Sequence, residues 1–113
     1  MTEAEDGERR QFVRLDIRQK VSYKIIGTKK LGQSLTKNIS GGGIRFLAEH
    51  PLEPGTELEV ALRVPDREEP VRFIGQVVWS HPPQPSRPEV GVKFIRIDPQ
   101  DQALILHYTT LYP

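Results

Sequence analysis

Apolar residues alternate with polar ones along several short stretches of this sequence, and this pattern constrains the fold more than any other feature. The clearest stretches are residues 58–64 and 71–79. A period of two puts successive side chains on opposite faces of an extended chain, so each stretch is expected to form a strand with one buried face. Gly75 interrupts the second stretch, which indicates a bulge or the close approach of another segment.

The same alternation recurs along most of the chain. It occurs at residues 13–25, and shorter runs follow at 32–39, 44–46 and 90–94. Turn signals separate these runs, namely residues 27–30, the pair Pro54-Gly55 and the proline-rich loop at 81–89. About six short antiparallel strands with such turns usually close into a small barrel or a sandwich. The sequence therefore predicts a mainly β fold.

The end of the chain carries a helical signal instead. Asp98 before Pro99 fits an N-cap followed by proline at the first helical position, and Asp101 suits the first turn. We expect a helix at residues 98–112. Its apolar stripe is predicted to consist of Leu104, Tyr108 and Leu111, with Ile105 and Tyr112 beside it.

The chain of 113 residues is long enough for one domain. Residues 1–8 are acidic and offer no apolar face to bury, so we expect a flexible tail ahead of a single domain at residues 9–113. No run of about 18 apolar residues occurs, so no membrane insertion is expected. The absence of cysteine fits a reducing compartment, and we expect a cytoplasmic protein.

Charge is distributed unevenly along the chain. Residues 9–45 contain ten Lys and Arg against one acid, whereas residues 46–113 contain six basic and ten acidic residues. The positive first half favours an anionic partner. Basic side chains on a solvated strand face would give the same count, so charge alone does not decide between a binding surface and an ordinary one.

Three arginines lie at the junction of the tail and the first strand, in the segment RRQFVR at residues 9–14. Arg10 and Arg14 are four residues apart, and Arg9 adds a third guanidinium. A guanidinium donates two parallel hydrogen bonds to phosphate, reads the O6 and N7 edge of guanine, and stacks on bases. The spacing alone is common in basic chains.

A polar pair and three glycines follow in the segment KNISGGG at residues 37–43. Asn38 and Ser40 share one face of an extended strand, roughly 6.6 Å apart, where an amide and a hydroxyl can meet a purine edge or phosphate oxygens. Glycine lets a ligand approach the backbone, and residues with positive φ can aim successive N–H groups at an anion. An ordinary hairpin turn with a glycine bulge would have the same sequence.

Taken together, the two segments resemble the PilZ domain family, whose members are receptors for the bacterial second messenger cyclic di-GMP. The matching residues are Arg10 and Arg14, followed after a strand pair by Asn38, Ser40 and Gly43. The GQVVW and GVKF strands and the terminal helix agree as well, so the resemblance covers nearly the whole chain. It implies a six-stranded antiparallel β-barrel of the split-barrel type with a C-terminal α-helix.

The resemblance also implies a role for each matching residue. Arg10 and Arg14 would grip the phosphates and guanine of cyclic di-GMP. Asn38 and Ser40 would contact guanine and phosphate from the barrel surface, and Gly43 would keep the backbone clear of the base. No cofactor besides this ligand is expected.

Arg9 and Trp79 have further expected roles. In the family, an arginine just before the first motif accompanies the binding of two intercalated ligand molecules, so Arg9 predicts a ligand dimer. An aromatic residue at the position of Trp79 can stack on guanine in family members. The structural alternative is that Trp79 sits at the barrel rim and fills the gap between strand and helix.

These observations favour a cyclic di-GMP receptor whose arginine arm becomes ordered on binding and which docks on an unidentified downstream protein. One alternative is a ligand-independent adaptor with the same fold. Another is a nucleic-acid-binding barrel, which the acidic second half and only eight aromatic residues disfavour, so no nucleic-acid partner is expected. We expect neither a metal site nor an enzyme, because His50, His81 and His107 lack ligand spacing and no nucleophile arrangement occurs.

Overall fold

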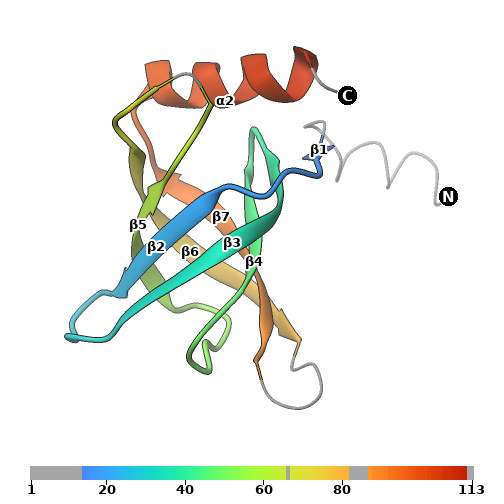
Figure 1. Cartoon of the computed structure of the whole chain (residues 1–113). Helices are drawn as coiled ribbons and strands as arrows, with labels where there is room; N and C mark the ends of the chain where they lie inside the picture. The colour runs from blue at the N-terminus through green and yellow to red at the C-terminus, as the bar shows by residue number, and fades with distance from the viewer. Residues whose placement is uncertain (1–13, 66, 82–86, 112–113) are drawn as a thin grey trace, which may run out of the picture.

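A computed structural model describes the protein at residues 14–65, 67–81 and 87–111. Within these residues, seven strands precede one helix (Figure 1): β1 (Arg14–Leu15), β2 (Lys20–Ile25), β3 (Leu31–Ser40), β4 (Gly43–Leu47), β5 (Glu57–Leu62), β6 (Val71–His81), β7 (Glu89–Arg96) and α2 (Pro99–Leu111). Strands β2 to β7 form a closed antiparallel barrel in the order β3-β2-β5-β6-β7-β4, because β4 pairs back onto β3. The predicted six-stranded barrel with a C-terminal helix is confirmed.

The inward-facing residues of the strands form one core. In β5, for example, Leu58, Val60 and Leu62 are buried, whereas Glu57 and Glu59 are exposed. Burying each such apolar side chain contributes about 1.5–3 kcal/mol to folding. The alternation in the sequence therefore translates directly into an apolar barrel interior and a polar exterior, and any ligand must meet this fold on its outer surface.

The predicted first strand is divided in two, which corrects the continuous strand expected from residues 13–25. Strands β1 and β2 pair with different parts of β3, and residues 16–19 between them are irregular. Thr36, which is 1% exposed, bridges this gap from β3. Its hydroxyl donates to the carbonyl of Ile17 and accepts from the N–H of Gln19 at 2.9 Å. Thr36 thus fixes the connection that leads to β1.

The predicted turns and the bulge are confirmed within the described residues. Gly27 and Gly55 have φ values of 86° and 97°, which favour glycine, and they lie in the turns before β3 and β5. A register shift follows Ile74 in the pairing of β6 with β7, and a Cβ on Gly75 would lie 2.4 Å from a methyl of Val92. Of the proline-rich loop, residues 82–86 lie outside the described part of the chain.

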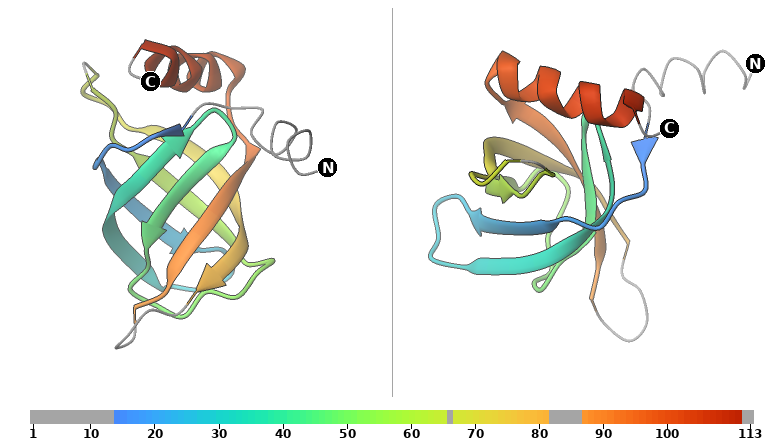
Figure 2. Two further views of the ribbon diagram at one scale, coloured as in Figure 1. Left: turned by 90° about the vertical axis from the view of Figure 1, so that its right-hand side faces the viewer. Right: turned by 45° about the horizontal axis from the view of Figure 1, so that its top comes forward.

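Helix α2 lies across one end of the barrel, as both views in Figure 2 show. Asp98 caps it as predicted, because its carboxylate accepts a hydrogen bond of 2.8 Å from the N–H of Gln100. Within the described residues, no helix is long and apolar enough to cross a membrane.

The described part of the predicted stripe packs against the barrel, and Thr109 extends it. Ile105 is 1% exposed, Leu104 and Tyr108 are partly buried against the core, and Thr109, which the stripe did not include, is also 1% exposed. Thr109 can be buried because its hydroxyl donates to the carbonyl of Leu106, and Tyr108 stays at the boundary because its hydroxyl donates to the carbonyl of Pro65. The side chains of Leu111 and Tyr112 lie outside the described residues.

Candidate functional site

Two rows of residues cross the outer surface of the barrel where β3, β4, β7 and β6 lie side by side. In the first row each residue is the antiparallel partner of the next: Arg14, Ser40, Gly43, Lys93 and Gln76. Partners in an antiparallel sheet have Cα atoms about 4.5–5.5 Å apart. The register therefore places the arginine of β1 beside the serine at the end of β3.

The second row is built in the same way. It consists of Asn38, Arg45, Gly91 and Trp79, again as successive partners on β3, β4, β7 and β6. On the first three of these strands the rows are two residues apart, so they share the outer face at a spacing of roughly 6.6 Å. A polar pair, three cations and an indole thus lie on one continuous patch.

The two rows line a surface hollow of about 330 Å³. Its lining comes from five strands and the glycine turn, and it comprises Arg14, Asn38, Ser40, Gly42, Gly43, Ile44, Arg45, Val78, Trp79, Gly91, Val92 and Lys93. Five of the seven predicted ligand-binding residues are therefore together: Arg14, Asn38, Ser40, Gly43 and Trp79. The other two, Arg9 and Arg10, lie outside the described residues.

Ser40 and the glycine turn are fixed by hydrogen bonds. The Ser40 hydroxyl accepts from the N–H of Gly42 at 3.2 Å and donates to the carbonyl of Gly43 at 3.3 Å. From the helix side, the amide of Gln102 donates to the carbonyl of Gly41 at 2.7 Å. The turn that edges the hollow is thus held from two directions.

The structure gives a packing reason for Gly43. A Cβ at this position would lie 2.1 Å from the carbonyl oxygen of Val92, because β4 and β7 approach closely there. Among the described residues, the glycines with positive φ are Gly27 and Gly55, so Gly43 is not required by a left-handed backbone. The expectation that positive φ aims the N–H groups of this turn at an anion is therefore not met, and the N–H of Gly42 already bonds to Ser40.

Trp79 does not fill a gap between strand and helix. It lies near the end of β6 that is remote from α2 (Figure 1), is 39% exposed, and covers Gly91, where a Cβ would lie 2.4 Å from its Nε1. The Cζ atom of Arg45 lies 5.7 Å from the centre of the indole ring, within cation–π range. The indole thus presents a partly open aromatic face to the hollow.

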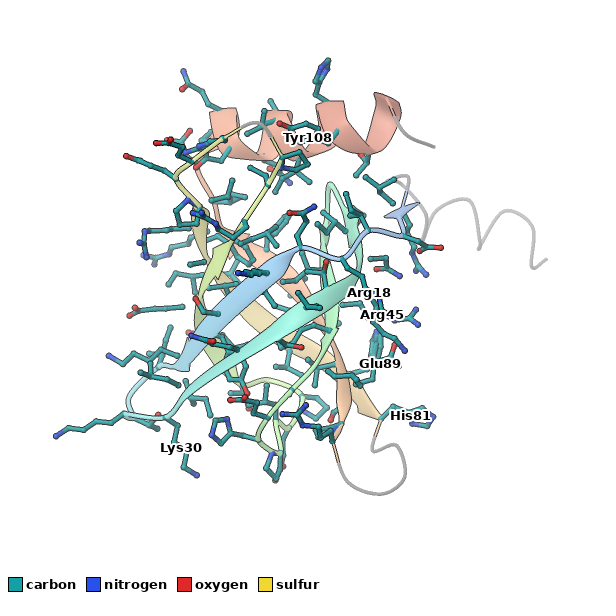
Figure 3. The ribbon with its side chains drawn as sticks, viewed as in Figure 1. Arg18, Lys30, Arg45, His81, Glu89 and Tyr108 are labelled. Carbon is teal, nitrogen blue, oxygen red and sulfur yellow. The ribbon has the colours of Figure 1, made fainter. Side chains whose placement is uncertain are left out.

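An ion pair holds Arg45 in this position. Its Nε donates to a carboxylate oxygen of Glu89, and Figure 3 shows the two residues together on one flank of the barrel. Lys37 lies 3.4 Å from the other oxygen of the same carboxylate. Glu89 is thus shared by two cations.

The charge of the hollow is positive. Arg14, Arg45 and Lys93 line it, and no acidic side chain does so among the described residues. The described residues also contain no cluster of three His, Asp or Glu that could hold a metal ion. Cations beside an aromatic face and a polar pair suit a ligand that combines phosphate with a flat heterocycle.

Comparison with known proteins identifies the family of this chain. The family model described as the PilZ domain matches residues 8–111. The chain belongs to the PilZ domain family. A search of the curated proteins finds no match.

Solved structures share this PilZ fold. The Bacillus subtilis inhibitor of motility (MotI/DgrA) has a TM-score of 0.77 at 24% identity, with 91% of this chain and 50% of that chain covered. YcgR in complex with c-di-GMP from Escherichia coli has a TM-score of 0.72 at 13% identity, with 91% and 45% covered. The PilZ domain of Escherichia coli YcgR with c-di-GMP has 0.69 at 13%, with 92% and 91% covered. The chain thus spans about half the length of the first two proteins.

Two cationic residues of the hollow in this PilZ domain, Arg45 and Lys93, were not singled out from the sequence. Arg45 follows Gly43 by two positions, so the period of a strand could have placed its side chain on the same face. Lys93 reaches the hollow only because β7 pairs with β4, with Lys93 opposite Gly43. That pairing joins segments far apart in the chain, and no local sequence pattern predicts it.

Proposed function

We propose that this PilZ domain is a receptor for cyclic di-GMP and binds it in the hollow between β1, β3, β4, β6 and β7. The observation that carries the proposal is the pairing of Arg14 with Ser40, which joins the two predicted motifs at one edge of a positive hollow. Cyclic di-GMP consists of two guanosines joined through two phosphates, so its receptor needs hydrogen-bond donors to phosphate and groups that read guanine side by side. Family relatives that are described as complexes with c-di-GMP support the choice of ligand.

The polar residues of the hollow would contact different parts of the ligand. Arg14, joined by Arg10, would bind phosphate and the guanine edge through bidentate hydrogen bonds. Among the described residues, no hydrogen bond of the Asn38 side chain is found, so its amide is available to a guanine edge. The Ser40 hydroxyl would add a contact while it continues to support the glycine turn. Gly43 keeps this edge of the hollow free of a side chain.

Trp79 would provide the stacking surface. Its indole is backed by Gly91 and partly covered by Arg45, so a guanine can stack either on the exposed part of the ring or between the ring and the guanidinium. Arg45 would then move with its partner Glu89 or remain stacked on the outer face of the base. Arg9 would support a second, intercalated ligand molecule.

Arg14 is already paired with Ser40 in β1, so ligand binding would order the rest of the arginine arm, residues 8–13, over the glycine turn. A ligand shifts a protein only by its difference in affinity between two states, and contacts to Arg10 would supply that difference. The ordered arm and the filled hollow would then form the surface that a downstream protein recognises. In this proposal the chain is a bacterial, cytoplasmic signalling receptor and has no catalytic role.

Titration calorimetry with cyclic di-GMP tests the proposal. We expect saturable heat for the native chain and a tenfold to hundredfold weaker affinity for Arg14→Ala, because one charge-assisted hydrogen bond contributes roughly 1.5–3 kcal/mol. Ser40→Ala should also weaken binding. Lys30→Ala is the control, since Lys30 lies at the β2–β3 turn, away from the hollow (Figure 3).

The outcomes separate the competing functions. Absence of heat with the native chain would overturn the receptor proposal and favour a ligand-independent adaptor. Binding of mixed oligonucleotides with a steep salt dependence, and none of cyclic di-GMP, would favour a nucleic-acid-binding barrel. A ligand-to-protein ratio of two, reduced to one by Arg9→Ala, would support the ligand dimer.

A further inference from the structure

A second concave surface lies on the other side of the barrel, where β3, β2, β5 and β6 are neighbours. Its central row consists of successive strand partners: Gln33, Ser22, Ala61 and Arg72. The two middle residues are small, so they form the floor of a groove that runs across the strands. None of these residues lines the hollow described above.

Two parallel rows of longer side chains form the walls of this groove, which we call the basic groove. One wall consists of Leu31, Lys24, Glu59, Ile74 and Arg96 as successive partners. The other wall begins with the pair Leu35 and Lys20 and continues to Arg63, whose N–H donates to the carbonyl of Lys20 at 2.9 Å. Two adjoining hollows of about 640 and 740 Å³ lie along the floor.

The width of the basic groove suits one helix. Its walls are four residues apart along each strand, which corresponds to roughly 13 Å at about 3.3 Å per residue. An α-helix with its side chains is about 10–12 Å in diameter. The groove can therefore accept a single helix that lies across the strands, a recurring mode of peptide recognition.

The chemistry of the walls combines uncompensated positive charge with exposed apolar residues. Apart from Arg87 and Glu49, which pair with each other at 3.6 Å, the groove contains five cations, Lys20, Lys24, Arg63, Arg72 and Arg96, against one acid, Glu59. Within the described residues, none of these cations forms a side-chain ion pair. Leu31 and Leu35, at one end of the two walls, are 66% and 46% exposed.

These features favour a protein segment over a nucleic acid. A phosphate backbone would use the cations but leave the two leucines in water, and base stacking needs exposed aromatic rings. The aromatic residues that border the groove, Tyr23 and Phe73, are buried in the core. An amphipathic helix with one apolar stripe and acidic flanks would use both the leucines and the cations.

We propose that the basic groove docks an acidic amphipathic helix of a partner protein. The leucines and the small floor residues receive its apolar stripe, and Lys20, Lys24 and Arg72 pair with its carboxylates. This inference rests on the docking step of the proposed function, but it shares no residue with the ligand hollow. The proposed docking groove and the proposed ligand site can therefore be disproved independently.

Fluorescence anisotropy with a designed probe tests this inference on the full chain. The probe is a labelled helical peptide of about 20 residues with a leucine stripe and glutamate on its flanks, and a scrambled peptide of the same composition is the comparison. We expect saturable binding of the helical peptide, at least tenfold weaker binding of the scrambled one, and a further tenfold loss in the double variant Lys24→Glu, Arg72→Glu. Leu31→Ser should weaken binding about threefold or more.

Controls separate the groove from general charge and from the nucleotide. Lys29→Glu reverses one charge at the exposed β2–β3 turn, outside the groove, and should bind the peptide like the native chain. Amide chemical shifts should move at residues 20–24, 31–35 and 59–63 and not at residues 38–45. The groove variants should keep native affinity for cyclic di-GMP, so a loss there would reflect misfolding.

Several results would overturn the inference. These are no saturable binding at millimolar peptide, equal binding of the scrambled peptide, or shifts confined to the ligand hollow. Tighter binding of an oligonucleotide to the same residues would show that the groove binds a nucleic acid and not a helix. Concentration-dependent dimerisation that is abolished by Leu31→Ser would show that the partner of the groove is a second copy of this chain.

Discussion

Arg14 lies directly opposite Ser40 in the pairing of β1 with β3. Strand β1 is only two residues long, so this pair and the adjacent pair of Leu15 with Ile39 join the arginine segment to the end of β3, beside the glycine turn. The contact depends on the connection at residues 16–19, which Thr36 holds from the neighbouring strand. The site is therefore assembled by strand register and by one buried hydroxyl.

Thr36→Val should lower both stability and ligand affinity. The change keeps the shape of the side chain but leaves the carbonyl of Ile17 and the N–H of Gln19 without their partner, at a cost of about 1–3 kcal/mol. Because these groups anchor β1, cyclic di-GMP binding should weaken as well. Urea unfolding and calorimetry measure the two effects.

The matched control for this variant is Thr109→Val on α2. It also removes a buried hydroxyl, but this hydroxyl donates within the helix, to the carbonyl of Leu106. Stability should fall while affinity stays native. If both variants changed affinity equally, the anchoring role of Thr36 would be refuted.

Gly43→Ala should destabilise the barrel. The new methyl would be placed 2.1 Å from the carbonyl oxygen of Val92, so β4 and β7 must separate, and such overpacking typically costs 1–3 kcal/mol. Thermal unfolding measures the change. An unaltered melting temperature together with lost binding would show instead that this glycine matters only for the ligand.

Trp79 should report ligand binding directly, because it is the only tryptophan in the chain. Stacking of guanine on its partly exposed indole should change the fluorescence in proportion to saturation. Trp79→Ala should weaken binding by roughly 1–3 kcal/mol, the range for a base on an aromatic side chain. A Trp79→Ala variant that folds and binds with native affinity would exclude stacking.

Alkaline pH should destabilise the protein through Tyr23. Burial raises the pKa of this hydroxyl above its ordinary value of 10.0, against the opposing effect of backbone hydrogen bonds from Glu49 and His50. Above pH 10 the unfolded chain releases a proton that the folded chain retains, so the free energy of unfolding falls as pH rises through this range.

The measurement is urea unfolding at several pH values between 9 and 11.5. Tyr23→Phe removes the ionisable group, and its stability should fall less steeply with pH than that of the native chain, even though the variant loses the contact of 2.9 Å between the hydroxyl and His50 Nδ1. Parallel curves for the two proteins would contradict a raised pKa.

The strands and the polar pair could be predicted because their signals are local. Alternation fixed which residues of β5 and β6 face inward, and a spacing of two placed Asn38 and Ser40 on one face. The division of the first strand could not be read, since it depends on a hydrogen bond from Thr36, 17 residues beyond Gln19. The same period of two could have placed Arg45 on the face of Gly43. The position of Lys93 could not be predicted in this way, because it depends on the pairing of β7 with β4.

The helix illustrates the same limit. Its cap at Asp98 is a local feature and was predicted, but the burial of Thr109 was missed because its hydroxyl is satisfied by a hydrogen bond within the helix. A polar side chain whose hydrogen bond is satisfied in this way can be buried. Which face of α2 meets the barrel is decided by the position of the strands and not by the hydrophobic pattern alone.

A crystal structure of the full chain with cyclic di-GMP would show whether both motifs bind the same ligand molecule. We predict ligand in the hollow, with Arg14 and Ser40 touching the same molecule, its guanine against Trp79, and the segment at residues 9–13 folded over the glycine turn. Ligand bound elsewhere on the barrel, or contacts from only one of the two motifs, would rule out this site.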